Sequence, residues 1–205
     1  MTKTPSSAPQ LRGPSEHDVR NQIVEAATEY FGHYGYEKTT VSDLAKAIGF
    51  SKAYIYKFFD SKQAIGEVIC ANRLSTIVAA IDEAVAGTPS APEQLRRTFK
   101  TLVDSGSQLF FQDRKLYEIA KTSAGEAWPS TRGYEEHLRG VVLQIVRNGR
   151  ESGDFERKTP LDETANAIFL VMRPYINPLL LQHNLDNVDE ATTQLSNLIL
   201  RSLTP

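Results

Sequence analysis

Lysine and tyrosine side chains alternate over one short segment and can contact a polyanion. The segment holds Lys52, Tyr54, Tyr56 and Lys57. Their ammonium and phenol groups can donate hydrogen bonds to phosphate oxygens, or to base acceptors such as guanine N7 and O6. Lys38–Lys62 has five lysines and two aspartates, a local excess of +3, although the whole chain has a formal net charge of −2. Because phosphate affinity depends on the charge of one face, this balance permits nucleic-acid binding. A merely solvated charged surface is the alternative.

Two short helices joined by a tight turn must position these side chains. Thr40 can cap the first helix, and Asp43 favours the positive end of its dipole. Gly49 ends this helix at a position where a positive φ costs glycine little. Ser51 can then cap a second helix that runs from Lys52 to about Phe59. This arrangement predicts a helix-turn-helix between about Thr40 and Phe59.

In a helix-turn-helix the second helix enters a major groove by its N-terminal residues. Ala53 belongs to this first turn, and Thr40 and Ser42 can add contacts from the preceding helix. Helical hairpins with a glycine turn also occur for packing alone, so the spacing leaves both interpretations open.

The stretch FGHYGYEKTTVSDLAKAIGFSKAYIYKFFDSKQAI resembles the DNA-binding domain of the tetracycline-repressor (TetR) family. That family typically reads close to T-T-hydrophobic-x-x-I-A-x-x-A-G-V-S-K-G-T-L-Y-x-H-F-x-S-K-E. The resemblance covers roughly residues 18 to 66. The chain departs from the pattern at four positions, which are Ala53, Lys57, Phe58 and Asp60.

The resemblance implies a role for particular residues of this sequence. Thr40, Tyr56 and Lys62 are expected to hold phosphates. Four further residues are expected at the groove: Ser51, Lys52, Ala53 and Tyr54. The resemblance also implies a transcriptional regulator, by default a repressor, that binds a pseudo-palindromic operator as a homodimer and is released by a small-molecule effector.

Apolar residues recur at helical spacing along almost the whole chain, which predicts an all-α fold. Residues 1–15, rich in proline and serine, are expected to form a disordered tail. We expect a helix-turn-helix domain over 16–62 and an effector-binding and dimerisation domain over 63–205. A long helix, capped by Asp60 or Ser61 and running to a break at Gly87, connects the two. Ser90 and Glu93 have the form of a capping box for the next helix.

The larger domain has aromatic residues that can line an effector pocket. An arginine in an apolar helix can meet an anionic effector there, although a surface or interface salt bridge is the commoner role. Each aromatic residue can equally be plain core. The candidates are Phe99, Phe110, Tyr117, Trp128, Tyr134, Phe169, Arg173 and Tyr175.

Domains of this type usually dimerise through their last two long helices, here about 160–182 and 188–203, packed as a four-helix bundle with the partner. Pro174 and Pro178 should kink or end the first of these. The candidate interface residues, which can also be internal core, are Ala165, Ile168, Met172, Leu195, Leu198 and Ile199.

Several other classes of function find little support in the sequence. Cys70 is the single cysteine, so no intrachain disulfide forms, and a lone helical cysteine is usually inert rather than a sensor. No metal-ligand or catalytic motif occurs, and we expect neither a metal, a cofactor nor an enzyme. No stretch approaches about 18 consecutive apolar residues, so a cytoplasmic protein without a membrane span is expected. An all-α enzyme and a helical interaction module stay as alternatives.

Overall fold

Helices account for all the regular structure in the computed structural model, which describes residues 15–205. This confirms the predicted all-α fold. The predicted tail lies outside the described residues except for Ser15. The helices are α1 (Glu16–Tyr34), α2 (Val41–Ala47), α3 (Lys52–Ile55), α4 (Lys62–Ala86), α5 (Ala91–Gln112), α6 (Arg114–Gly125), α7 (Pro129–Ser152), α8 (Leu161–Ile176), α9 (Pro178–Leu181), the short 3₁₀ helix η1 (Leu185–Asn187) and α10 (Val188–Ser202).

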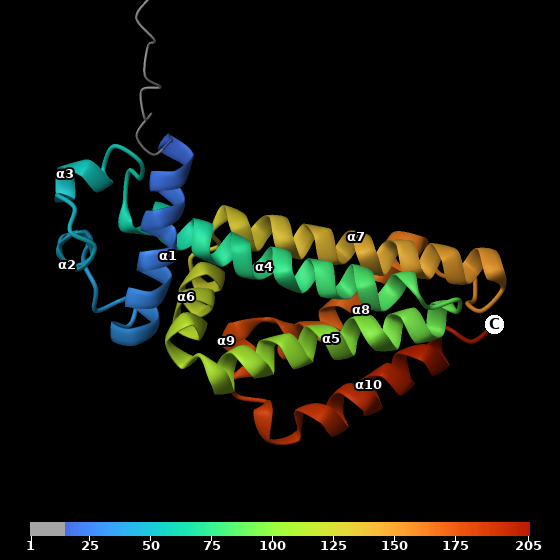
Figure 1. Ribbon diagram of the computed structural model, residues 1–205. Helices are drawn as coiled ribbons and strands as arrows, with labels where there is room; N and C mark the ends of the chain where they lie inside the picture. The colour runs from blue at the N-terminus through green and yellow to red at the C-terminus, as the bar shows by residue number, and fades with distance from the viewer. Residues whose placement is uncertain (1–14) are drawn as a thin grey trace, which may run out of the picture.

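Helices α1 to α3, here named the head, stand at one end of the molecule (Figure 1). The apolar stripe of α1 is buried at Val19, Ile23, Ala27 and Phe31, as its three- and four-residue spacing predicts. Gly35 ends α1 with a φ of +90°, and its N–H donates to the Phe31 carbonyl at 2.8 Å. The chain can therefore turn sharply toward α2.

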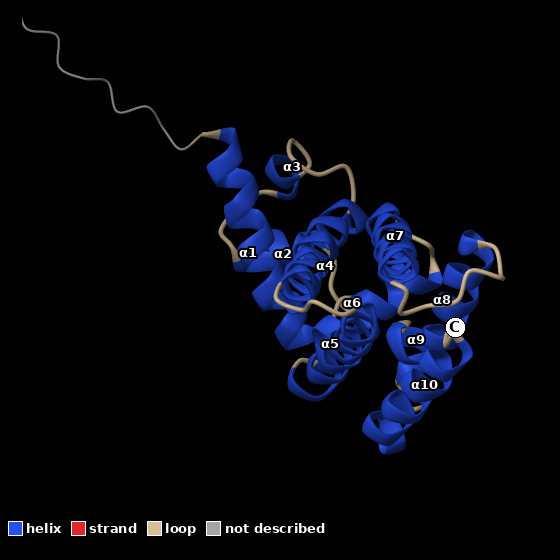
Figure 2. Cartoon of the chain, turned by 90° about the vertical axis from the view of Figure 1, so that its right-hand side faces the viewer, coloured by secondary structure: helices blue, strands red, loops and turns tan. Residues whose placement is uncertain are grey.

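Helices α4 to α10 form the body, and Figure 2 shows α4, α5 and α7 nearly end-on within it. Helix α4 leaves the head and packs against α5 and α7 in the body and against α1 and α6. Among the described residues α4 alone is long and apolar enough to cross a membrane by length and composition, with a mean hydropathy of 1.5. The core helix of a soluble protein passes the same test.

Two hydrophobic cores meet where α4 passes from the head to the body. The body core contains buried residues of α4, α5, α7, α8 and α10. The head core recruits Ile65 and Ile69 of α4, Leu116 and Ile119 of α6, and Trp128 just before α7. The head core therefore extends past residue 62, where the domain boundary is predicted.

The end of α3 and the cap of α5 differ from the sequence prediction. Helix α3 ends at Ile55, because the next turn tightens: the N–H of Phe58 donates to the carbonyl of Ile55 at 2.9 Å. Ser90 precedes α5 without a side-chain capping bond, so the capping box was wrong. Helix α7 begins at Pro129, where a proline needs no hydrogen-bond partner for its nitrogen.

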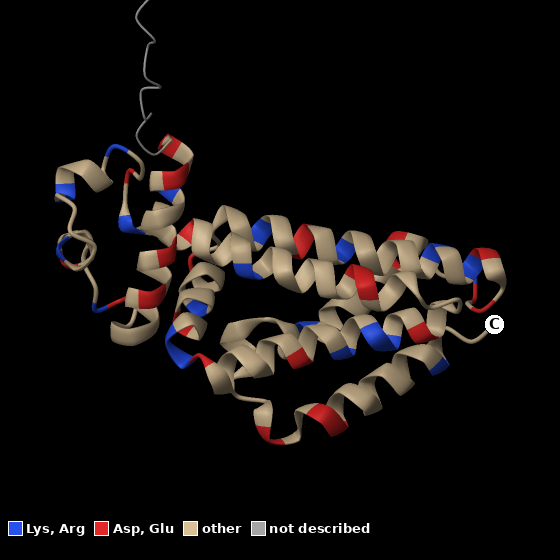
Figure 3. Ribbon diagram, in the orientation of Figure 1, with Lys and Arg blue, Asp and Glu red and all other residues tan. Residues whose placement is uncertain are grey.

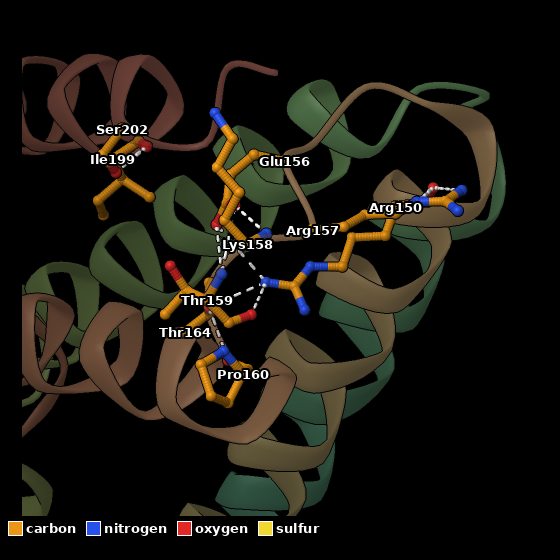
Figure 4. A network of polar contacts seen from close by, with 9 residues as sticks. All are labelled: Arg150, Glu156, Arg157, Lys158, Thr159, Pro160, Thr164, Ile199 and Ser202. Carbon is orange, nitrogen blue, oxygen red and sulfur yellow. Dashed lines mark hydrogen bonds and ion pairs between the residues drawn. The ribbon is translucent and has the colours of Figure 1, made fainter.

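A polar network closes the end of the body farthest from the head (Figure 4). Arg150 of α7 donates to the Thr159 carbonyl at 2.8 Å and to the Thr164 hydroxyl at 3.1 Å, and it lies 3.7 Å from the Glu156 carboxylate. The backbone N–H of Glu156 donates to the Leu203 carbonyl at 2.8 Å. Hydrogen bonds from nearby backbone N–H groups lower the pKa of Glu156. This network joins α7, the start of α8 and the end of α10.

Candidate DNA-binding face and ligand cavity

The first helix of the predicted motif is capped by a reciprocal pair. The Thr40 hydroxyl accepts from the Asp43 N–H at 3.2 Å and donates to the Asp43 carboxylate at 2.6 Å. The Thr40 N–H also donates to that carboxylate at 3.1 Å. These hydrogen bonds lower the pKa of Asp43, so the cap holds an ionised carboxylate at neutral pH. The Thr40 hydroxyl thus has a capping role besides the phosphate contact that the resemblance implies.

The turn between α2 and α3 depends on Gly49, which has a φ of +73°. The N–H of Phe50 donates to the Ala45 carbonyl at 2.9 Å, and that of Gly49 to the Lys46 carbonyl at 3.4 Å. This pair of bonds is a Schellman motif, which satisfies the carbonyls at the end of α2. The Ser51 side chain then accepts from the Tyr54 N–H at 3.0 Å and caps α3.

We expect Gly49→Val to lower the free energy of unfolding by about 1–2 kcal/mol, because an L residue is strained in the left-handed region. Gly87→Val is the matched control. Gly87 has a φ of −88°, and a Cβ at either glycine would meet nothing within 4 Å. The pair therefore isolates the backbone angle. Urea unfolding measures both changes, and equal losses would contradict the role assigned to Gly49.

Helix α3 presents its polar side chains on an exposed face. Ser51, Lys52, Ala53, Tyr56 and Lys57 are exposed there. The ammonium group of Lys52 lies 5.7 Å from the ring centroid of Tyr56, within cation–π range. The face therefore combines cations with hydrogen-bond donors.

Tyr54 takes a different position from its neighbours. Its half-buried ring packs edge-to-face between Phe50 and Phe58, with centroids 5.0 and 5.3 Å away. The ammonium group of Lys57 lies 5.6 Å from the Tyr54 centroid. This aromatic row supports the exposed face from behind, a role that alternation alone did not predict.

The core of the head anchors α3 from below. Ile55 and Phe59 are buried in it. The Arg20 guanidinium of α1 donates to the Phe58 carbonyl at 2.6 Å and lies 4.1 Å from the centroid of the Phe59 ring. Such a charge-assisted bond is stronger than a neutral one. Arg20 thus ties α1 to the turn that follows α3, and the sequence reading missed it.

Lys62 is half-buried and has a partner within the head. Its ammonium group donates to the Tyr36 carbonyl at 3.0 Å and lies 4.2 Å from the Tyr36 ring centroid. It therefore joins the start of α4 to the segment after α1. The phosphate contact that the resemblance implies for Lys62 stays a prediction. Ser42 lies half-buried on α2.

Positive charge marks the head in Figure 3, where Lys and Arg segments occur in α2, in α3 and in the loops beside them. Acidic residues of the head lie mainly on α1, including Glu25 and Glu29. The local excess of cations therefore comes from the two short helices together with the loops beside them and the start of α4.

A cavity of about 90 Å³ lies in the body, and residues of the helices from α4 to α9 line it. Its wall is mostly apolar, and it includes Ile69, Leu116 and Ile119, which also belong to the head core. The cavity therefore adjoins both cores. Its lining residues are Ile69, Cys70, Arg73, Leu74, Ile77, Leu102, Gly106, Leu109, Leu116, Tyr117, Ile119, Ala120, Thr131, Tyr134, Glu135, Leu138, Phe169, Arg173, Ile176, Asn177, Pro178 and Leu181.

Half of the predicted pocket residues line this cavity, namely Tyr117, Tyr134, Phe169 and Arg173. The other four do not. Phe99 and Tyr175 pack against each other with ring centroids 6.2 Å apart, and Phe110 packs on Phe111 and Tyr117. The polar lining residues Arg73, Thr131, Glu135 and Asn177 were missed, because helical spacing alone does not show which face meets a void.

Trp128 is the clearest correction, since it belongs to the junction of head and body. Its ring lies 5.8 Å from the Tyr36 ring, between centroids, and a Cβ on Gly66 would lie 3.0 Å from it. Its N–H donates to the Glu126 carboxylate at 2.7 Å. Beside it, the Glu67 carboxylate of α4 accepts from the Ser130 N–H at the start of α7, at 3.2 Å.

Most of the predicted dimer-interface residues lie inside the body. Ala165, Ile168, Met172 and Ile199 are buried in its core, and Leu195 packs against that core, so this part of the prediction is corrected. Leu198 is 63% exposed. The large apolar residues that α8 does expose are Leu170 and Val171.

Cys70 is buried at the cavity wall, and its Sγ donates to the Ser123 hydroxyl at 3.4 Å. The Ser123 hydroxyl also shares a hydrogen bond of 2.5 Å with Thr131. Within residues 15–205 no group of three or more potential metal ligands occurs.

Comparison with known proteins agrees with both parts of the structure. Residues 23–68 match the family of bacterial regulatory proteins described as the tetR family. Residues 91–196 match the family described as the Tetracyclin repressor-like, C-terminal domain. The first match covers the head with the start of α4, and the second covers most of the body.

Similar proteins include regulators of transcription. The uncharacterised HTH-type transcriptional regulator YhgD of Bacillus subtilis is 26% identical over 161 residues, covering 78% of this chain and 81% of YhgD. The biofilm operon negative transcriptional regulator IcaR of Staphylococcus aureus is 39% identical over 49 residues, covering 24% of this chain and 26% of IcaR.

A solved structure shares the fold over most of its length. FadR of Bacillus subtilis, in complex with stearoyl-CoA, superposes with a TM-score of 0.66 at 17% identity, covering 89% of this chain and 98% of FadR. The family models, the helix-turn-helix and the helical body agree. The chain therefore belongs to the TetR family and is a DNA-binding transcriptional regulator, not an enzyme.

Proposed function

We propose that this regulator is a repressor that binds a pseudo-palindromic operator as a homodimer and is released by a small-molecule effector. The observation that carries the proposal is that a cationic exposed face on α3 and a body cavity are joined by shared core residues. IcaR, which is 39% identical over 49 residues, is described as a negative transcriptional regulator. Repression follows physically when a bound dimer occupies the DNA that transcription requires.

The proposed DNA contacts divide into two kinds. Lys52, Lys57 and Tyr56 are exposed donors, and we assign them to phosphate oxygens or base acceptors. Ser51 and Ala53 stand at the N-terminal turn of α3, the part of a recognition helix that meets base edges. Thr40, Ser42 and Tyr54 complete the proposed contacts. Thr40 also caps α2, Tyr54 also packs against Phe50 and Phe58, and Ser42 is half-buried.

The proposed dimer face comprises the exposed apolar residues Leu170, Val171 and Leu198 on α8 and α10. Exposed apolar side chains of this size favour burial against a second copy. A two-fold dimer places its recognition helices about 34 Å apart, or a multiple of this spacing, so that both enter major grooves on one side of the duplex.

Effector release follows from the size and position of the cavity. Its volume of about 90 Å³ is below the roughly 300–1,000 Å³ of typical ligand pockets. A bound effector must therefore widen it. Because Ile69 of α4 and Leu116 of α6 belong to both the wall and the head core, widening displaces the support of the head. The spacing of the two recognition helices changes as a result.

Two further proposals concern organisation and location. The head domain is proposed to span residues 16–62 and the effector-binding and dimerisation domain residues 63–205, with α4 shared between their cores. A regulator that acts on the chromosome is proposed to be cytoplasmic in a bacterial cell.

Fluorescence anisotropy with labelled duplexes from the DNA upstream of this chain's own gene tests operator binding. We expect one duplex to bind much more tightly than a scrambled duplex of equal composition. The logarithm of its affinity should fall with the logarithm of salt concentration by about 0.9 per neutralised phosphate. Sedimentation of the same complex should give two chains per duplex. Equal, salt-independent binding of all duplexes would refute the proposal.

A further inference from the structure

The polar groups that line the cavity and have no partner are hydrogen-bond donors. Arg73 of α4 and Arg173 of α8 line it, and neither guanidinium has an ion-pair or hydrogen-bond partner within residues 15–205. The Tyr134 hydroxyl likewise has none in this range, and only burial affects its titration. Asn177 adds an amide NH₂, since its oxygen already accepts from the Leu179 N–H at 3.0 Å.

The remaining polar groups of the wall have partners within the chain. The Tyr117 hydroxyl donates to the Pro178 carbonyl at 2.7 Å. The Cys70 thiol and the Thr131 hydroxyl both meet Ser123. A ligand therefore finds few groups on the wall that still need a donor.

The single carboxylate on the wall is also occupied. Glu135 lies 3.5 Å from the Arg139 guanidinium, which itself stands 4.3 Å from the Phe169 ring centroid. A cationic ligand would have to compete with Arg139 for Glu135 and would meet two unpaired guanidinium groups. The charges of the wall thus oppose a cation and favour an anion.

The Tyr134 phenol is protonated at neutral pH and is therefore a donor. Burial raises its pKa above the ordinary value. Arg73 and Arg173 are exposed, so they stand at the rim of the cavity, whereas the deeper wall is apolar. The wall is therefore mostly apolar, with one exposed guanidinium on α4 and another on α8.

We infer that the effector is an anionic amphiphile, with an apolar body inside the cavity and an anionic group held by Arg73, Arg173 or both. This inference rests on the proposed function, in which the cavity is the effector site. A free carboxylic acid and an acyl thioester of a phosphate-bearing carrier share this chemistry.

Three ligands of equal chain length test the inference on the full-length protein at pH 7.5. They are decanoate, decanol and decylamine, which share a ten-carbon chain and differ in the head group and its charge. Isothermal titration calorimetry should show decanoate binding at least tenfold more tightly than decylamine, with decanol between them. Decanoyl-coenzyme A, added as a fourth ligand, identifies the source of the anion: tighter binding than decanoate indicates a thioester, and weaker binding a free acid.

Substitutions locate the anionic group. Arg173→Gln or Arg73→Gln should weaken decanoate binding by about tenfold, the value expected for losing a partly exposed charge-assisted bond. Arg173→Lys should bind decanoate more tightly than Arg173→Gln does, because it keeps the positive charge. Arg147→Gln is the matched control, because Arg147 is an exposed residue of α7 that lies outside the cavity wall. Loss of decanoate affinity in this control alone would overturn the inference.

The outcomes separate this inference from the proposed function, because operator binding is measured first without any ligand. If decylamine or decanol binds as tightly as decanoate and releases the operator, the effector site stands and the anionic class is overturned. If no ligand binds while operator binding persists, the anionic class is also overturned. If decanoate binds through the arginines without releasing the operator, the anionic site is supported and effector release fails.

Discussion

Replacing Trp128 with alanine is expected to lower the free energy of unfolding by about 3–5 kcal/mol, the usual cost of truncating a large buried aromatic residue. Trp128 is 1% exposed and packs between Gly66 of α4 and Tyr36 of the head. The substitution opens a cavity between head and body and removes the hydrogen bond to Glu126. Urea unfolding followed by circular dichroism measures the loss at one fixed protein concentration, since dimerisation changes apparent stability.

Phe111→Ala provides the control for Trp128. Phe111 is 70% exposed, and an exposed substitution of this kind changes stability by about 0.5 kcal/mol or less. Trp128→Phe should lose less than Trp128→Ala, because part of the ring volume stays. A loss below about 1 kcal/mol for Trp128→Ala would show that the two cores are not joined at this residue.

Removing both exposed lysines of α3 and its following turn is expected to weaken operator binding about a thousandfold at 0.1 M salt. The double variant Lys52→Ala/Lys57→Ala removes four ammonium groups from a dimer. If each holds one phosphate, the salt slope falls by about 3–4 units, because each contact releases about 0.9 counterion. The loss of affinity at 0.1 M salt, relative to 1 M salt, is the salt ratio raised to this change in slope, which is about a thousandfold. Anisotropy titrations from 0.05 to about 0.3 M salt give both values.

Lys100→Ala is the matched control for the lysine variant. Lys100 lies on α5 of the body, where it pairs with Asp104 at 2.9 Å. Its removal should leave the salt slope within about 0.5 unit of the original value. A double variant with unchanged affinity and slope would remove Lys52 and Lys57 from the DNA-binding face. Circular dichroism and urea unfolding confirm that each variant remains folded.

The fold followed from local signals where capping, spacing and turn residues agreed. Thr40, Gly49 and Ser51 each have the predicted backbone role, because caps and positive φ depend on the nearest few residues. The end of α3 was wrong, since the tight turn after Ile55 depends on the clamp from Arg20. That clamp joins residues 38 positions apart and has no local signature.

The ligand site was only half predictable from the sequence. Aromatic residues were chosen as pocket candidates by type, yet Trp128 and Phe99 pack in cores whereas Tyr134 lines the cavity. Phe99 and Tyr134 lie on apolar helical stripes, and Trp128 immediately precedes α7. Which part of a stripe meets a void depends on the angles between helices, and periodicity carries no information on those angles. The buried face of α8 was mistaken for a partner face for the same reason.

The wall residues shared by the cavity and the head core, Ile69, Leu116 and Ile119, have a consequence for how such a regulator evolves. A substitution there that admits a new ligand also alters the stability of the DNA-reading head. Substitutions at Tyr134 or Arg173 carry no such penalty, because these residues stand outside the head core. Substitutions in α7 and α8 can therefore change the ligand preference most easily. Helices α4 and α6 keep the coupling between ligand binding and the DNA-reading head.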